Sequence, residues 1–236
     1  PYETLKFLLK NFDIDKNEEI EITVGSWKYP EKEIINSIIK NSNKNSFERI
    51  YQSLKTDFEY LNDFIINTKK IFPNSNIYFY DHHLSHFASS LFFGDVMNKR
   101  KNIYGIVADG RGALKSLSIW KFNKDKIEEI ISFPESHSFG AFYGSITYLL
   151  GFTPDKHEGK ITGLAAYGKK SKLIKIFKDY IHFSNNKIIV NENFIPFIRP
   201  SNINYLKKIT SGYSREDIAY AAQYNLEYNM IKIIKF

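Results

Sequence analysis

The sequence predicts an α/β fold, in which short strands alternate with amphipathic helices. A β-like run at residues 76–80 leads into an apolar segment with helical character at residues 87–93. A second strand-like run, residues 103–108, ends in Asp109 and a Gly-x-Gly turn. Helical spacing also extends over residues 46–72. With 236 residues, the chain is long enough for one large α/β domain or two smaller ones.

The composition indicates a folded chain without disulfides. Hydrophobic residues make up 43% and aromatic residues 16%, which is enough for a sizeable core and argues against disorder. The sequence has no run of eighteen apolar residues and no signal-peptide pattern, so we expect no membrane partner. Cysteine is absent, which excludes thiolate chemistry and fits a reducing compartment. We therefore expect a cytoplasmic protein.

The net charge of +7 could indicate a nucleic-acid partner, but the pattern of charge argues against one. The lysines are spread along the whole chain and mixed with acidic residues. Dense basic clusters occur only at residues 98–101 and at Lys169 and Lys170. A solvated basic surface is the favoured interpretation, and attraction of small anions is the next.

The elements before the central stretch also alternate between helix and strand. In chain order we expect a helix over residues 5–12, a strand over 19–24, helices over 30–39 and 46–72, and a turn over 73–76.

Beyond Asp109, residues 116–122 and 127–132 read as strands joined by a polar turn, which predicts a hairpin. We expect a helix over 141–150 with Gly151 as its C-cap, a loop over 152–157, a glycine-spaced segment over 158–168, a helix over 169–183, a strand over 187–190, irregular chain over 196–208, and a final helix capped by Ser214.

Three of the six histidines fall within five residues, directly after Asp81. If Asp81 is the N-cap of a helix, His82 and His86 lie one turn apart on the same face and can converge on one ion. Two histidines at this spacing are more often surface or core residues than ligands. The strand-end carboxylate of Asp109 shifts the balance toward a metal site, and this donor set suits iron or another first-row divalent metal better than calcium.

The glycine-spaced segment has two interpretations, which the sequence leaves open. Gly159, Gly163 and Gly168 could let backbone amides approach a ligand, with Lys160 near a helix start that favours phosphate or carboxylate. The same glycines could instead let a helix pack tightly on a neighbour. The sequence has no P-loop, Rossmann fingerprint or serine nucleophile elbow. Phosphates could instead be held by an Asp-Gly hairpin loop of the actin–sugar-kinase–chaperone type, as at Asp109.

Several motifs, in their order and spacing, resemble the O-carbamoyltransferases, which include enzymes that carbamoylate nodulation factors, aminoglycosides and cephem antibiotics. The resemblance is strong over residues 75–236 and weaker before. The motifs are HHLSHFAS (82–89), DGRG (109–112), SIW (118–120), the stretch 142–147, Gly151 with Phe152, and the stretch 158–168.

The resemblance implies an N-terminal domain with the actin-like fold of the tRNA threonylcarbamoyl-transferase subunit. Residues 1–236 would form part of this domain, incomplete at both ends. The C-terminal domain that makes carbamoyl-adenylate from carbamoyl phosphate and ATP would be absent from this chain. The family transfers the carbamoyl group to a hydroxyl of a small-molecule acceptor. Because both ends of the sequence fall inside expected elements, we expect this fragment to be inactive alone.

The resemblance also assigns site residues. His82, His86 and Asp109 match iron ligands, with a further metal aspartate expected beyond residue 236. The stretch 158–168 resembles the segment that lines the adenylate site, and the Asp-Gly hairpin loop at Asp109 is the other expected phosphate contact. The expected residues of the adenylate site are Gly110, Gly112, Glu158, Gly159, Lys160 and Gly163.

A base is needed to take the proton of the acceptor hydroxyl, and His83 and His137 are the candidates. His83 lies off the face shared by His82 and His86, so a structural role is equally open. Two positions depart from the family pattern: Ala113 stands where many members have an acidic residue, and Phe87 where many have alanine. The first puts a role for position 113 in doubt, and the second concerns packing. The alternative functions are a non-catalytic actin-like domain that binds a nucleotide or metal, and a basic RNA-associated protein.

Overall fold

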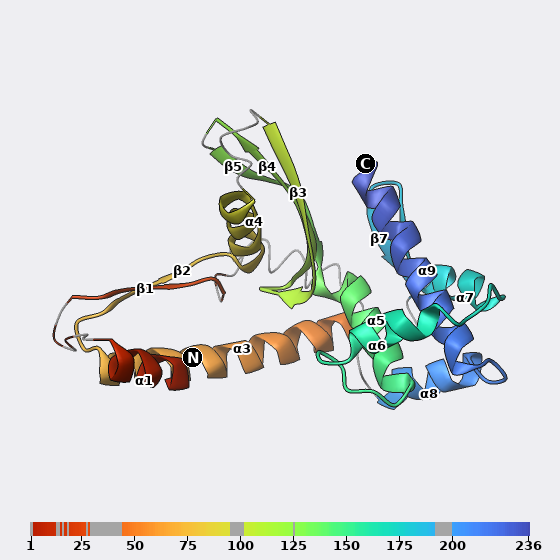
Figure 1. The fold of residues 1–236 in the computed structure, drawn as a ribbon, viewed down its shortest axis with the longest axis horizontal. Coiled ribbons are helices and arrows are strands. Elements are labelled where there is room, and N and C mark those ends of the chain that lie inside the picture. The colour runs from red at the N-terminus through yellow and green to blue at the C-terminus, as the bar shows by residue number, and fades with distance from the viewer. Residues whose placement is uncertain are drawn as a thin grey trace.

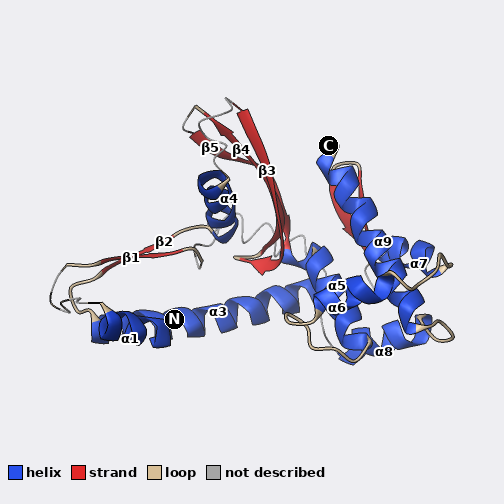
Figure 2. Cartoon of the chain, viewed as in Figure 1, coloured by secondary structure: helices blue, strands red, loops and turns tan. Residues whose placement is uncertain are grey.

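The computed structural model describes residues 2–12, 15, 17, 19–26, 28, 44–94, 102–124, 126–191 and 200–236. Helices and small sheets alternate along the chain, which confirms the predicted α/β class (Figure 2). The actin-like assignment stays a prediction. Within the described residues, no helix combines the length and apolar character that a bilayer crossing requires.

In the described residues of the first part, two helices accompany a pair of parallel strands. Helix α1 (Tyr2–Asn11) lies against the long helix α3 (Lys44–Ile71) (Figure 1). Strand β1 (Glu21–Val24) pairs in parallel with β2 (Asn76–Phe79). The expected helix over residues 30–39 lies outside the described residues.

The central part is a three-stranded antiparallel sheet covered by one helix. The strands β3 (Asn102–Gly112), β4 (Lys115–Asn123) and β5 (Lys126–Pro134) follow one another in space as in sequence, and β4 and β5 form the predicted hairpin. Helix α4 (His82–Phe93) contacts β3 and β4.

Phe87 packs between this helix and the sheet. It is buried and stacks on Trp120, with 6.2 Å between ring centroids. Its ring also occupies the space beside Gly105, where an added Cβ would lie 2.3 Å from a ring carbon. Phe87, Leu91, Val107, Trp120 and Phe122 form a small core of their own. The phenylalanine that departs from the family pattern is therefore a packing residue.

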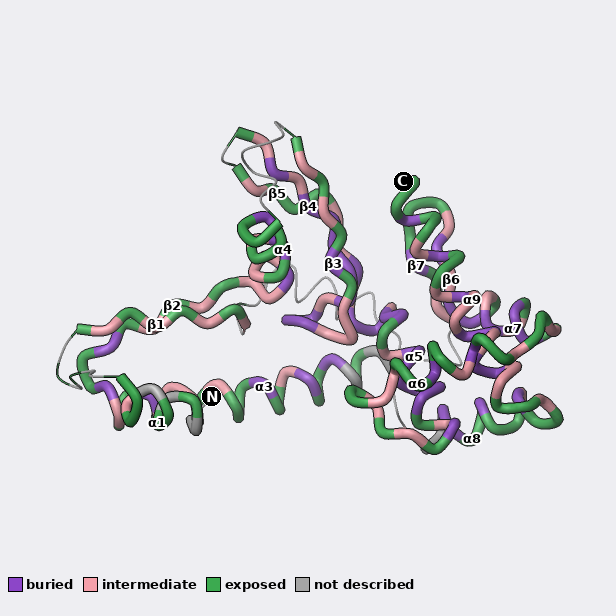
Figure 3. The backbone as a smooth tube through the Cα atoms, in the orientation of Figure 1, coloured by how far each residue is buried: buried purple, intermediate pink, exposed green. Residues whose placement is uncertain are grey.

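The last part is mainly helical and holds the larger core. It contains η1 (Glu135–His137), α5 (Phe139–Leu149), α6 (Glu158–Ala165), α7 (Leu173–Tyr180), β6 (Ile181–Ser184), β7 (Lys187–Val190), α8 (Pro200–Ile209) and α9 (Arg215–Ile234). Figure 3 shows buried segments concentrated here and where α4 meets the sheet. Ser214 caps α9 as predicted, its hydroxyl accepting from the Asp217 amide. Gly151 follows the end of α5 with a φ of +81°, the left-handed conformation expected after a helix.

Two of the predicted elements were wrong in part. The helix expected over residues 169–183 ends at Tyr180, and residues 181–184 form β6, which pairs with β7. Asn185 and Asn186 both adopt positive φ and close this hairpin, a turn that asparagine tolerates. The stretch expected to be irregular over 196–208 contains α8 from Pro200 onward, because proline is well suited to the first turn of a helix.

A buried asparagine on α9 joins this hairpin to the helix. The Asn229 Oδ1 atom accepts a hydrogen bond of 2.7 Å from the Phe183 amide, and its Nδ2 atom donates to the Asn225 carbonyl. Asn229→Leu should lower the free energy of unfolding by about 2 kcal/mol, because it leaves a buried amide without a partner. Urea denaturation measures this, with Asn204→Ala at an exposed position of α8 as the control. Equal effects in the two variants would contradict the prediction.

Candidate metal and nucleotide site

Asp81 sets the start of α4, as predicted. Its Oδ1 atom accepts a hydrogen bond of 2.9 Å from the Leu84 amide, satisfying one of the free N–H groups in the first turn. The helix begins at His82, so His82 and His86 occupy the same face of successive turns.

Asp109 reaches the same place from an irregular part of β3. The pairing of β3 with β4 shifts register between Ala108 and Gly112, which leaves residues 109–111 outside the regular ladder. Such irregularities redirect side chains at the ends of strands. The Asp109 Oδ1 atom accepts from the Gly110 amide at 2.6 Å, so its other oxygen is available to the histidines.

Three donor atoms from these two elements converge. The His82 Nε2 atom lies 2.8 Å from Asp109 Oδ2 and 3.1 Å from His86 Nε2, and the His86 and Asp109 atoms are 3.7 Å apart. Among the described residues, these three form a group whose ligand atoms all lie within 4.8 Å of one another. Two imidazole nitrogens and a carboxylate are a donor set for a first-row divalent metal, so these residues fit such an ion.

The ring of His82 is fixed by its surroundings. Its Nδ1 atom lies 3.2 Å from the carbonyl oxygen of Gly25, which can only accept, so Nδ1 carries a proton and Nε2 is directed at Asp109. Gly112 lies against the same ring, since a Cβ there would be 2.2 Å from the His82 Cδ2 atom. The structure thus places Gly112, expected at the nucleotide, in contact with the first histidine of the cluster.

The electrostatics of the pair favour a cation at this position. The hydrogen bond with Asp109 raises the pKa of His82, although burial acts in the opposite direction. Burial raises the pKa of Asp109, but the His82 and Gly110 contacts outweigh it, and the net pKa is lowered. The carboxylate therefore stays ionised and attracts positive charge.

His83 points into the core instead. Its ring is fully buried, and its Nδ1 atom lies 2.7 Å from Ser118 Oγ, which also accepts from the Trp120 indole at 2.6 Å. Burial lowers the pKa of His83 to about 4, so the ring is neutral near pH 7. Ser118 could not be predicted as the partner of His83, because the two residues are 35 positions apart in the sequence and no motif joins them.

His137 is the last residue of η1 and is not one of the three clustered donors. Its Nδ1 atom is 2.9 Å from Ser136 Oγ, and its carbonyl accepts from Ser116 Oγ at 3.3 Å. Burial lowers the pKa of His137. The residue as a whole is partly exposed, whereas His83 is fully buried.

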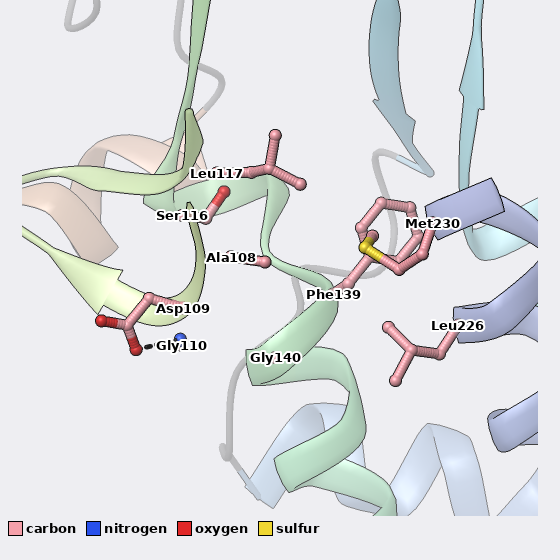
Figure 4. Close-up of a pocket in the computed structure, with 9 residues that line it drawn as sticks. All are labelled: Ala108, Asp109, Gly110, Ser116, Leu117, Phe139, Gly140, Leu226 and Met230. Carbon is pink, nitrogen blue, oxygen red and sulfur yellow. Dashed lines mark hydrogen bonds between the residues drawn. The ribbon is translucent and has the colours of Figure 1, made fainter. Parts of the chain in front are cut away.

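A cavity of about 350 Å³ adjoins the backbone of Asp109 and Gly110. Figure 4 shows that the Asp109 carboxylate points away from the apolar side chains that line the other side of this cavity. Those side chains come from β4, α5 and α9: Leu117, Phe139, Leu226 and Met230. The cavity and the cluster thus share the strand end at residues 108–110 but lie on different sides of it.

The three glycines of the glycine-spaced segment have different surroundings, so each of the two interpretations applies to part of the segment. Gly159 and Gly163 lie on α6, and among the described residues no atom comes within 4 Å of a Cβ added to either. Gly168 packs tightly, since a Cβ there would lie 2.1 Å from the Glu216 carbonyl oxygen. Space for a ligand therefore exists at the first two positions only.

The two charged residues of this segment also differ. Glu158 starts α6, and its Oε1 atom accepts from the Asp155 amide at 2.8 Å, which stabilises the preceding loop. Lys160 is exposed, with its Nζ atom 5.5 Å from the Phe152 ring centroid. Lys160 therefore remains accessible to an anion in the described structure. Gly110, on the Asp-Gly loop, also has open space at its Cβ position.

Comparison with known proteins identifies the family. The model of the family described as carbamoyltransferase N-terminus matches residues 6–235. The chain belongs to this family.

Three curated relatives of this carbamoyltransferase N-terminus chain are described as uncharacterized. Two are from Methanocaldococcus jannaschii: one is 29% identical over 70% of this chain and 29% of its own length, and the other is 38% identical over 44% and 19%. The third, from Synechocystis, is 32% identical over 39% of this chain and 14% of its own length. The chain thus matches less than a third of the length of these relatives.

The different surroundings of the glycines lead to a test by matched substitutions. Gly163→Ala should raise the free energy of unfolding by about 0.5 kcal/mol, because alanine stabilises a helix and has room here. Gly168→Ala should lower it by about 1–3 kcal/mol through the clash with α9. Thermal and urea unfolding of both variants measure these shifts. A destabilised Gly163→Ala protein would show that this glycine packs against the chain after all.

Proposed function

We propose that this chain is part of the catalytic first domain of an O-carbamoyltransferase. In this proposal the intact enzyme makes carbamoyl-adenylate from carbamoyl phosphate and ATP and passes the carbamoyl group to a hydroxyl of a small-molecule acceptor. The observation that carries the proposal is the convergence of His82, His86 and Asp109 in a chain of the carbamoyltransferase family. The actin-like fold is part of the same proposal.

In this proposal the three residues hold a divalent metal, with iron as the expected ion. A carbamoyl carbonyl is a weak electrophile, because electron donation from nitrogen offsets its partial positive charge. The bound metal would supply a Lewis acid at this carbonyl. The chain contributes the orientation of the ligands: the Gly25 carbonyl and the close contact with Gly112 hold the His82 ring, and the Gly110 amide holds Asp109.

The proposed adenylate contacts are the open glycine face of α6 and the Asp-Gly loop. At Gly159, Gly163 and Gly110 the absence of a side chain would let a ligand approach the backbone closely. Lys160 is exposed on the same helix as Gly159 and Gly163 and could pair with a phosphate. The Glu158 Oε1 atom accepts from the Asp155 amide, which leaves Oε2 as the acceptor for ribose hydroxyls in this proposal.

In this proposal His137 is favoured over His83 as the base. A base must be neutral and must reach the acceptor hydroxyl. The lowered pKa keeps His137 neutral near pH 7, and the residue as a whole is partly exposed. His83 is neutral as well but fully buried and held by Ser118, which favours a role in positioning α4.

The metal proposal is tested by removing one ligand at a time. His82→Ala and His86→Ala should each lower the affinity for Fe²⁺ or Co²⁺ at least about tenfold, because each removes one of few ligands. His157→Ala, at a histidine whose Nδ1 atom accepts from the Thr153 amide, serves as the control. Metal analysis and chelator competition measure the affinity, and equal losses in all three variants would contradict the site.

Transfer itself requires the intact protein, supplied with carbamoyl phosphate, ATP and hydroxyl-bearing acceptors. Incorporation of labelled carbamoyl into an acceptor, lost in His82→Ala, would support the proposal. Metal binding without any carbamoyl-adenylate formation or transfer would contradict it and favour a non-catalytic binding domain.

The nucleotide contacts are tested at Gly163. Because Gly163→Ala should leave the fold intact, weaker binding of an AMP analogue to this variant would locate the nucleotide on α6. We expect a loss of about tenfold, the effect of one methyl group in a close contact. Calorimetric titration measures it, with Lys235→Ala at the exposed end of α9 as the control. Unchanged affinity would exclude Gly163 from the site.

A further inference from the structure

We propose that Lys115 is a positioning residue for the cluster of His82, His86 and Asp109, acting through Asp81. The inference rests on the proposed metal site but concerns a residue that does not belong to it. Lys115 is the first residue of β4, directly after the turn that follows β3.

Lys115 forms the centre of a partly buried group of three charges, in which Glu129 is the most exposed member. Its Nζ atom lies 2.7 Å from Asp81 Oδ2 and 2.5 Å from Glu129 Oε2, and only 13% of its side chain is exposed. Burial lowers the pKa of Lys115, but the two carboxylates outweigh this effect, so the side chain stays charged. Partly buried ion pairs of this kind have defined geometry, because leaving either partner alone is costly.

Asp81 connects this group to the histidines. One carboxylate oxygen of Asp81 accepts from the Leu84 amide, and the other accepts from Lys115. Both oxygens are thus engaged, and the first turn of α4 cannot rotate without breaking one of these bonds. Since His82 directly follows Asp81, the ion pair also fixes the direction of the His82 side chain.

The same hairpin that carries Lys115 also carries the third ligand. Asp109 lies on β3, and Gly112, which packs on His82, is paired with Lys115 across the turn. The two turn residues, Ala113 and Leu114, both adopt positive φ (48° and 71°), which is unfavourable for residues other than glycine. The turn is therefore held in one conformation by its surroundings, and Lys115 has a fixed relation to Asp109.

These contacts link the two halves of the site. Helix α4 brings Asp81 and two histidines, the β3–β4 hairpin brings Asp109 and Lys115, and the Lys115–Asp81 pair ties one half to the other. Lys115 also lies 5.4 Å from the Trp120 ring centroid, beside the Ser118–His83 contact under the helix. A loss of the ion pair should therefore loosen the His82–Asp109 distance before it unfolds the domain.

The test compares ion pairs on the same hairpin. Lys115→Met should weaken Co²⁺ binding about 10- to 100-fold, the usual effect of removing support for metal ligands. Lys126→Met, which breaks the exposed Lys126–Glu128 pair, should leave binding unchanged. The readouts are chelator competition and the visible spectrum of bound Co²⁺, with circular dichroism as a check of folding. A folded Lys115→Met protein with unchanged affinity and spectrum would overturn the inference.

A second variant shows whether Lys115 acts through Asp81. Asp81→Asn keeps an N-cap residue but removes the charge that pairs with Lys115. If both residues act through one contact, the double variant should have the same affinity for Co²⁺ as the single variant with the lower affinity. Additive losses would overturn the route through Asp81. Should Lys115→Met fail to fold, weaker Co²⁺ binding by folded Asp81→Asn still supports the inference, and unchanged binding overturns it.

The two proposals fail in different ways. If the unaltered protein binds neither Fe²⁺ nor Co²⁺, the metal site is wrong, and the role of Lys115 in it is overturned as well. If the unaltered protein binds and only the histidine variants lose affinity, the metal site stands and the positioning role of Lys115 is overturned.

Discussion

The site depends on one hydrogen bond, from the Leu84 amide to the carboxylate of Asp81. This cap decides which residue begins α4, and successive residues of a helix are rotated by about 100°. With His82 as the first residue, His82 and His86 face Asp109, and His83 faces the sheet. A start one residue later would rotate the face offered to the carboxylate, so the cap sets the geometry of the cluster.

Features that depend on short-range spacing were predicted well from the sequence. The cap at Asp81, the shared face of His82 and His86, and the hairpin of β4 and β5 all follow from residues within a few positions of one another. Asp109 was predicted as a ligand because the strand was expected to end there. In the structure the strand continues to Gly112 after a register shift that begins at Ala108. Local chemistry was therefore sufficient to name the residues of the cluster.

Features that depend on distant neighbours could not be predicted. Lys115 and Asp81 are 34 residues apart in the sequence, and no motif or spacing indicates that they form an ion pair. The roles of the glycines show the same limit, because Gly163 and Gly168 look alike in sequence and only their neighbours distinguish open space from close packing. The strand β6 was read as helix for a related reason: its apolar residues suit either structure until β7 pairs with it.

The polar contact beneath α4 explains why the helix keeps one register on the sheet. His83, Phe87 and Leu91 form the buried face of α4, one turn apart, and two of the three are apolar. Apolar residues alone could pack on the sheet in several positions, since hydrophobic contacts have little directionality. The His83–Ser118 hydrogen bond can form in one position only, and losing it would leave a buried imidazole without this partner. The neutral state of His83 makes its burial tolerable, and the directional bond keeps the other face of the helix, with His82 and His86, aligned with Asp109.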